Sequence, residues 1–276
     1  MIKLLKIEAK KILTYKIFWI LIGLYFIFLS AGISMAEFMI NNMVDSTNRH
    51  LPIPIPHVAI YFFPWVWQNI AFFASIRYVL IFPAMVIIIL ITNEFTFKTI
   101  RQNVINGMSK AEFLASKLQL ILLISLAITF LLSIGTLILG LSNTSDISFG
   151  LVLEKSSFIF GFFVTILSFQ IFALFFGFLL RNTGLSIALF TLYVFIVEPI
   201  LYYFLKSPIV FKNDISTYLP VNSILRITEY PAIPVLKQVM GLNLQDSVSF
   251  FACCIPLFYS ALMVGIVYWV LLKRDL

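Results

Sequence analysis

Charged residues are scarce in this chain. Asp, Glu, Lys and Arg make up 11% of its 276 residues, whereas 61% are hydrophobic and the mean hydropathy is +1.04. Soluble domains carry roughly 25% charged residues, so this composition excludes an ordinary soluble protein. The excess of apolar residues predicts an integral membrane protein whose helices cross a bilayer.

Cysteine and histidine are also scarce, with two of each. Cys253 and Cys254 are adjacent, and neighbouring cysteines rarely bridge each other without strain. We therefore expect them to pack as apolar side chains, with an intermolecular disulfide as the alternative. His50 and His57 both fall in the first outer loop, outside the bundle in which a membrane-embedded hydrolase would need them. No cluster has the spacing of a metal site.

The chain also lacks the phosphate-binding loop G-x-x-x-x-G-K-[ST]. The backbone amides and the lysine of that loop hold nucleotide phosphates. Any ATP hydrolysis that drives this protein must then be supplied by another chain. We predict that this chain is not an enzyme and binds no cofactor itself.

Six apolar runs are each long enough for a helix of about 20 residues that spans a bilayer. They are continuously apolar and do not alternate with a period of two, which indicates helices and disfavours an outer-membrane barrel. The predicted fold is therefore all-α, with one transmembrane domain. The predicted spans are residues 17–38, 72–91, 114–141, 158–180, 185–205 and 250–272.

Lys and Arg are distributed unevenly over the connections between these runs. With the N-terminus inside, twelve of the 19 lie on the cytoplasmic side, six lie outside and Arg77 lies within a span. Because cytoplasmic loops carry the excess of basic residues, we predict that both termini lie on the cytoplasmic side of the membrane. Contact with anionic lipid then accounts for much of the net charge of +7, and no nucleic-acid partner is needed.

Residues 1–16 are predicted to form a helix in the inner membrane interface. Apolar residues recur at helical spacing from Ile2 to Ile12, while the lysines of this segment occupy another face. An ordinary basic anchor is the alternative. Further along the chain, Pro83, Pro199 and Pro256 lie within spans and are predicted bends.

A polar segment with clear helix signals lies between the second and third runs. Asn106-Gly107 predicts a helix end, since glycine tolerates the left-handed conformation after a last turn. Ser109 and Glu112 fit a capping box, in which both side chains satisfy free backbone amides at a helix start. The sequence therefore predicts a short helix, a tight turn, and a third span that begins before the membrane.

The short helix is predicted over Phe95–Ile105, with Phe97, Ile100 and Val104 on one face. An amphipathic helix of this kind can pack against lipid, against its own bundle, or into a groove on a soluble partner. Composition does not choose between these three arrangements.

The signals in this segment form a pattern that resembles bacterial type-2 ABC exporter permeases. The pattern has an acidic residue at the inner end of the second span, Thr-x-Arg, a glycine, a Ser-Lys pair, an aromatic residue and a lysine that leads into the third span. The six-span plan, Glu8 with its basic neighbours and the outer segment Tyr218-Leu-Pro-Val-Asn extend the resemblance. The positions of the pattern are Glu94, Thr99, Arg101, Gly107, Ser109, Lys110, Phe113 and Lys117.

The resemblance implies the permease subunit of an ABC exporter, which pairs as a homodimer or heterodimer and binds two copies of a separate ATPase. That partner would hold ATP and Mg, and the cell membrane in question would be the bacterial cytoplasmic membrane. Residues 93–113 would form the coupling region, and part of the outer loop 206–249, within 216–244, would re-enter the membrane without crossing it. The coupling residues would be Glu94, Thr99, Arg101, Gly107, Ser109 and Lys110.

Three ionisable residues, Glu37, Arg77 and Glu198, fall in the outer part of the predicted spans. An unpaired charge in the membrane is costly. An ion pair of Arg77 with Glu37 or Glu198 is therefore the favoured interpretation, and an outer gate or substrate contact is the alternative.

Neutral polar residues lie at mid-depth. Ser125, Thr129 and Ser133 follow each other at four-residue spacing on the third span, and Ser168 and Gln170 lie on the fourth. Hydrogen bonds between helices are the favoured interpretation, and a translocation path is the alternative.

The favoured function is therefore an ATP-driven exporter subunit. A six-span, ion-coupled secondary transporter is the alternative, because two three-span halves would have opposite orientations and could form an inverted repeat. The halves show no similarity, and no chain of acidic residues at mid-depth supports coupling to protons or sodium.

Overall fold

The computed structural model describes residues 8, 10–48, 61–206, 215–228 and 245–273, and in these residues the chain is helical, without a β-strand. Six helical segments are long and apolar enough to cross a membrane, which identifies a multi-pass membrane protein. They are α2 (Lys16–Asn48), α4 (Arg77–Thr96), α6 (Lys110–Asn143), α7 with α8 (Phe149–Leu153 and Ser157–Leu180), α9 with α10 (Thr183–Leu192 and Glu198–Lys206), and α13 (Phe250–Lys273).

The observed helices overlap the predicted spans, but the second span differs at its start. The predicted start at Phe72 falls inside a separate short helix, α3 (Val66–Ala74), and α4 begins only at Arg77. Ile76 between them has an extended backbone, with φ −63° and ψ 134°, which interrupts the helical path. Arg77 is therefore the first residue of α4. The sequence had indicated a position inside the span, and that prediction was wrong.

Helix α8 lies at the centre of the bundle, in contact with α3, α4, α6, α9 and α13. Its Phe162 and Phe169 are fully buried. Gly177 brings α8 close to α4, because a Cβ atom at this position would lie 3.3 Å from Ile91. In contrast, Phe130 of α6 is exposed, as expected for a side chain that faces lipid. The core is therefore formed around α8.

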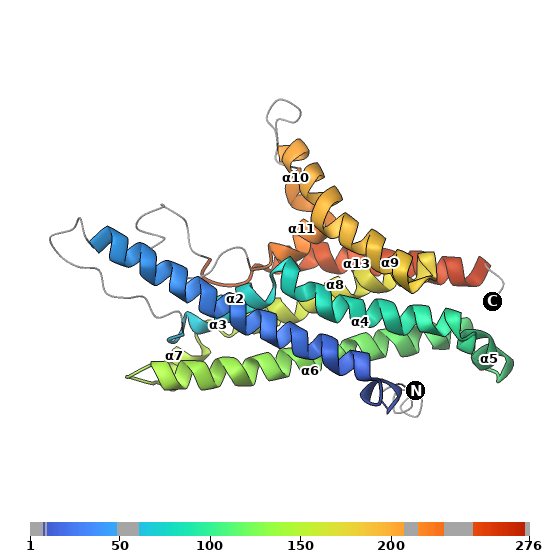
Figure 1. The fold of residues 1–276 in the computed structure, drawn as a ribbon, viewed down its shortest axis with the longest axis horizontal. Coiled ribbons are helices and arrows are strands. Elements are labelled where there is room, and N and C mark those ends of the chain that lie inside the picture. Colours follow the sequence, from blue (N-terminus) through green and yellow to red (C-terminus); the bar gives the residue numbers. More distant parts are fainter. Residues whose placement is uncertain (1–7, 9, 49–60, 207–214, 229–244, 274–276) are drawn as a thin grey trace.

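The two ends of the bundle are built differently (Figure 1). One end, which we call the α5 end, holds the start of α2, the end of α4, the short helix α5 (Thr99–Ile105), the start of α6 and the end of α13. The opposite end, the α3 end, holds α3 and α7. Half of the predicted interfacial helix over residues 1–16 lies outside the described residues, namely residues 1–7 and 9. Residues 10–13 are helical, and α2 begins at Lys16.

The fifth span is interrupted and diverges from the bundle toward its α10 end (Figure 1). A π-helical turn, η1 (Tyr193–Val197), separates α9 from α10. Pro199, a predicted bend, is the second residue of α10 and lies just beyond this turn. Pro83 and Pro256, by contrast, lie inside helices that continue through them.

Part of the long outer loop packs against the bundle. The short elements η2 (Ser216–Tyr218) and α11 (Pro220–Leu225) follow α10, and α11 contacts α8 and α13. Val221 and Ile224 of α11 are buried there. The remainder of the predicted re-entrant segment, residues 229–244, lies outside the described residues. In α13, Cys253 is buried, and it and Cys254 are free thiols.

Candidate functional site

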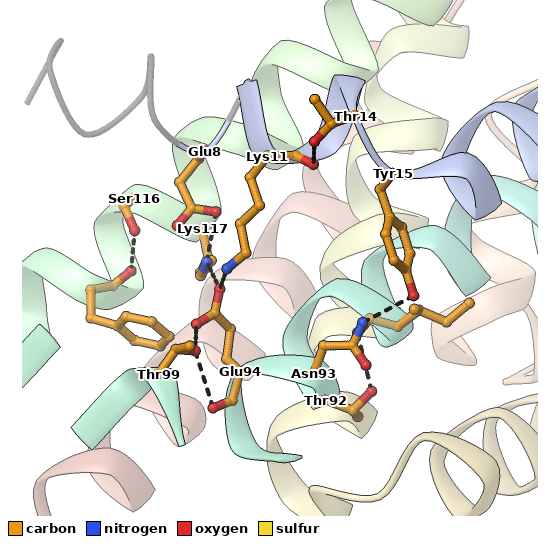
Figure 2. Close-up of polar contacts among 12 residues, drawn as sticks. Glu8, Lys11, Thr14, Tyr15, Thr92, Asn93, Glu94, Thr99, Ser116 and Lys117 are labelled. Atoms are coloured by element: carbon orange, nitrogen blue, oxygen red, sulfur yellow. Dashed lines mark hydrogen bonds and ion pairs between the residues drawn. The ribbon is translucent and has the colours of Figure 1, made fainter. Parts of the chain in front are cut away.

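Four charged side chains meet at the α5 end (Figure 2). Lys117 of α6 donates to Glu94 of α4 at 2.8 Å and to Glu8 of the N-terminal segment at 2.8 Å. Lys11 donates to the same oxygen of Glu94 at 2.5 Å. Two carboxylates and two ammonium groups therefore form one charge-balanced cluster, which we call the Glu94 network.

Thr99 joins helix α5 to this network. Its hydroxyl donates to the Glu94 carboxylate and also lies 3.3 Å from the Glu94 carbonyl oxygen. Lys98, which precedes Thr99, adopts a left-handed conformation with φ 54° and turns the chain from α4 into α5. The network therefore ties the start of α5 to α4, to α6 and to the segment before α2.

Burial differs across the network. The side chains of Glu94 and Lys117 are 2% and 1% exposed, whereas that of Lys11 is 48% exposed. Charges removed from water are tolerated when they are paired and hydrogen-bonded, and each of these two buried groups has more than one partner. Lys11 closes the network on its solvent side.

Aromatic rings surround the network and link three long helices. Phe178 of α8 makes edge contacts with Phe95 of α4 and Phe113 of α6, at centroid distances of 5.6 and 6.2 Å. The ammonium of Lys117 lies 5.2 Å from the centre of the Phe113 ring. Such edge contacts and cation–π contacts are favourable beyond simple burial, so the base of the α4–α6 connection is firmly packed.

The turn between α5 and α6 forms as predicted. Gly107 has φ +93°. The Ser109 hydroxyl accepts the Glu112 backbone N–H at 3.1 Å, and the Glu112 carboxylate accepts the Ser109 N–H at 2.9 Å, which confirms the capping box. Lys110 donates to the carbonyl of Leu272 at 3.4 Å, which connects the start of α6 to the end of α13.

Helix α5 is shorter than the predicted helix over Phe95–Ile105. Phe97 lies before the turn at Lys98, so it does not share a face with Ile100 as predicted. Ile100 is buried, whereas Phe97 and Ile105 are 68% and 74% exposed. Arg101 is exposed as well. The connection therefore presents two large apolar side chains and a cation outward.

A cavity of about 360 Å³ adjoins the network. Glu94, Phe95, Lys98, Arg101 and Arg181 are among its lining residues. The guanidinium of Arg181 lies 4.9 Å from the centre of the Phe95 ring. Three basic side chains and the Glu94 carboxylate thus line a hollow at the side of α5, with an excess of positive charge.

No model of a known protein family matches this chain, and no curated protein matches it.

Glu94 and Thr99 both belong to the predicted coupling residues, and the structure brings them into contact. The ion network of Lys117 with Glu94, Glu8 and Lys11 was not predicted from the sequence. A signal was available, because Lys117 lies inside the predicted third span, where a charge is costly unless it is paired.

At the other end of α4, the predicted ion pair of Arg77 with Glu37 or Glu198 is absent from the described part of the chain. Glu198 accepts hydrogen bonds from the backbone N–H groups of Val221 at 3.0 Å and Asn222 at 2.5 Å, at the start of α11. These amides satisfy the carboxylate without a direct ion pair, although the positive charge of Arg77 still acts on it.

Glu37 also has a neutral partner. The Tyr61 hydroxyl donates to its carboxylate at 2.7 Å. Burial and the neighbouring carboxylate raise the pKa of Tyr61, so the phenol remains protonated and keeps donating. Arg77 is therefore not required to stabilise Glu37.

Arg77 instead compensates for the interruption in the fifth span. It donates to the Val194 carbonyl at 3.0 Å. Within η1 the Glu198 N–H bonds to the carbonyl of Tyr193, five residues earlier. In the same register, the N–H of residue 199 would donate to the Val194 carbonyl. Residue 199 is a proline, which has no N–H, so this carbonyl lacks a backbone donor. The guanidinium supplies the missing donor, and this links α4 to the fifth span.

The mid-depth polar residues differ in their hydrogen bonding, and the hydroxyls of Thr129 and Ser168 have no partner in the described part of the chain. The Ser125 hydroxyl of α6 donates to Gln170 of α8 at 3.1 Å, and both side chains are fully buried. Ser133 donates to the Thr129 carbonyl in its own helix at 2.8 Å. The Ser125–Gln170 contact matches the favoured interpretation, a hydrogen bond between helices.

Proposed function

We propose that this chain is the permease subunit of an ATP-binding cassette exporter, which moves its substrate outward with ATP hydrolysed by a separate ATPase. The observation that carries the proposal is the construction of the α4–α6 connection. Its tip is exposed, and its base is bound to the bundle by the Glu94 network. A partner that displaces α5 would therefore displace α4, α6 and the N-terminal segment together.

The exposed tip has the chemistry of a docking helix. Phe97 and Ile105 offer apolar anchors, and Arg101 offers a cation beside the basic cavity. A short helix with such anchors can enter a groove on a soluble protein. In this proposal α5 is the coupling helix, and residues 93–113 are the coupling region.

The distribution of Lys and Arg supports placing the α5 end in the cytoplasm, where ATP is available. The exporter would contain two ATPase copies, which hold ATP and Mg, and two permease chains as a homodimer or heterodimer. The N-terminal segment would lie in the inner interface of the bacterial cytoplasmic membrane.

Affinity purification from the native membrane tests this function. We expect the tagged chain to co-purify with a protein that carries a phosphate-binding loop, and the complex to hydrolyse ATP in liposomes. Reversal of the exposed charge in R101E is expected to reduce ATPase recovery by about tenfold or more, as for loss of a charged contact.

The matched control is E154K, which reverses one exposed charge just after α7 at the α3 end. It is expected to leave ATPase recovery unchanged. Purification without any ATPase, or transport that survives ATP depletion and stops when the ion gradient is dissipated, would instead favour the ion-coupled secondary transporter.

A further inference from the structure

A second cavity, of about 380 Å³, lies where α3, the start of α4, the end of α10 and α11 meet. Its lining includes Arg77, Lys206 and Arg226, and no acidic side chain among the described residues. Cationic side chains around a hollow attract anions, because low-dielectric walls concentrate their field. We propose that this cavity binds an oxyanion of the phosphate class.

Two hydroxyl groups give this cavity further binding capacity. Ser75 and Thr228 also line it, and their side chains belong to residues that are 3% and 1% exposed. Within the described part of the chain, neither hydroxyl oxygen has a hydrogen-bond partner. Burying a hydroxyl without a partner is unfavourable. A bound oxyanion would accept hydrogen bonds from the surrounding cations, and from these two hydroxyls once their side chains turn toward the cavity, since both oxygens are now buried from it.

A phosphate group has four oxygens that can accept hydrogen bonds. It therefore suits this combination of cations and hydroxyls better than a halide ion does. Arg offers several N–H donors in a planar fork that matches phosphate, and Lys adds a compact charge. Arg77 already donates one bond to Val194, and its guanidinium has further N–H groups.

An aromatic wall adjoins the basic cavity. A neighbouring hollow of about 330 Å³ shares Arg77, Tyr78 and Tyr202 with it, and is lined in addition by Phe195 and Tyr203. The rings of Tyr78 and Phe195 are stacked, with their centres 4.9 Å apart. A ligand that combines a phosphate with an apolar portion would fill both hollows, so the phosphate of an amphipathic lipid fits as well as a free phosphate.

One carboxylate lies beside this region, at the aromatic hollow and not at the basic cavity. Glu198 lines the aromatic hollow, but its two oxygens accept the N–H groups of Val221 and Asn222. The inference is independent of the proposed exporter function, because it requires neither an ATPase nor transport.

Calorimetric titration of the full-length protein in an uncharged detergent tests the inference. The probes are inorganic phosphate, dihexanoylphosphatidylglycerol as a short-chain lipid phosphate, and the zwitterionic dihexanoylphosphatidylcholine as a comparison. We expect at least one of the first two to bind. Binding should weaken by about tenfold or more in R226Q and in K206Q, as for loss of a hydrogen bond to a charged group.

Two matched controls separate the cavity from general effects. K10Q removes a lysine exposed on the N-terminal segment and should not change binding. T228V removes an unpartnered hydroxyl from the cavity and should weaken binding, whereas T129V removes an unpartnered, buried hydroxyl from α6 and should not. T228V keeps all charges. It therefore still tests whether the cavity binds the oxyanion if R226Q and K206Q fail to fold.

Binding of inorganic phosphate that competes with the lipid would indicate a soluble oxyanion as the ligand. Binding of phosphatidylglycerol alone would indicate a lipid phosphate, and either result supports the site. The inference is overturned if neither probe binds, if phosphatidylcholine binds equally well, or if T228V and R226Q bind as the unmodified protein does.

Discussion

Lys117 and Glu94 lie on different helices, 23 residues apart, and their charged atoms are 2.8 Å from each other in the interior of the protein. The residues stand on either side of the α4–α6 connection. Their contact closes the base of that connection, and Thr99 attaches α5 to the same carboxylate. A displacement of α5 would therefore act on the bundle through these charged contacts as well as through the backbone.

Removal of one member of this pair should strongly destabilise the protein. K117M leaves the Glu94 carboxylate without its buried cation, and E94Q leaves Lys117 with Glu8 alone. Breaking a buried pair costs about 3–5 kcal/mol when the remaining charge is left uncompensated. Lys11 still compensates Glu94 in K117M, and Glu8 still compensates Lys117 in E94Q, so we expect a loss near or below the lower end of that range. Thermal unfolding of purified protein in detergent measures the loss.

Replacement of both partners should recover much of that stability. The double variant E94L/K117M exchanges two buried charges for apolar groups, which is often neutral. K11Q serves as the comparison, since Lys11 is half exposed and exposed pairs contribute about 1 kcal/mol or less. A double variant as unstable as the two single variants combined would contradict this account. ATPase association, measured on the stable double variant, would then show whether the charges themselves serve coupling.

Gly107 is required for its backbone conformation. Its φ of +93° is strained for residues with a side chain, although the space around it is open. G107A should therefore destabilise the protein by about 1–2 kcal/mol through the backbone alone. G265A is the control, because Gly265 lies inside α13 with equally open surroundings. It should be neutral or stabilising by about 1 kcal/mol or less, and equal behaviour of the two variants would refute the conformational explanation.

Local signals could be predicted from the sequence because they act over a few residues. The capping box of Ser109 and Glu112 and the turn at Gly107 depend on spacing within one helical turn, and both were predicted correctly. The long apolar runs likewise indicated helices. The break before Arg77 was missed, since it falls in an apolar stretch without the Gly or Pro that would have indicated it.

Long-range partners could not be predicted in the same way. Lys117 and Glu8 are 109 residues apart, and nothing in their spacing indicates that the N-terminal segment folds against the start of α6. Glu198 was expected to need a cation, but the chain instead brings the amides of α11 to it. Backbone donors carry no sequence signature, so this solution was not visible in the residue types.

The hydrogen bond between Ser125 and Gln170 predicts a measurable contribution to helix association. S125A should destabilise the protein by about 0.6–1.7 kcal/mol, the range for polar contacts between membrane helices. T129V should cost less, because the Thr129 hydroxyl has no partner among the described residues. Thermal unfolding of both variants, compared with their transport activity, decides whether Ser125 serves helix packing or transport. Unchanged stability in S125A together with impaired transport would instead favour a translocation path.

Arg77 and Pro199 should be energetically coupled, although no hydrogen bond joins them. R77M removes the donor to Val194 and leaves a carbonyl unsatisfied, at a cost of about 1–3 kcal/mol. P199A restores an N–H that can reach the carbonyls of the interrupted turn. The cost of R77M should therefore be smaller in the P199A background, and a double-mutant cycle by thermal unfolding measures the difference.

As a control, P256A should not alter the cost of R77M, because α13 continues through Pro256. Strict additivity of R77M and P199A would show that the guanidinium does not substitute for the missing proline N–H.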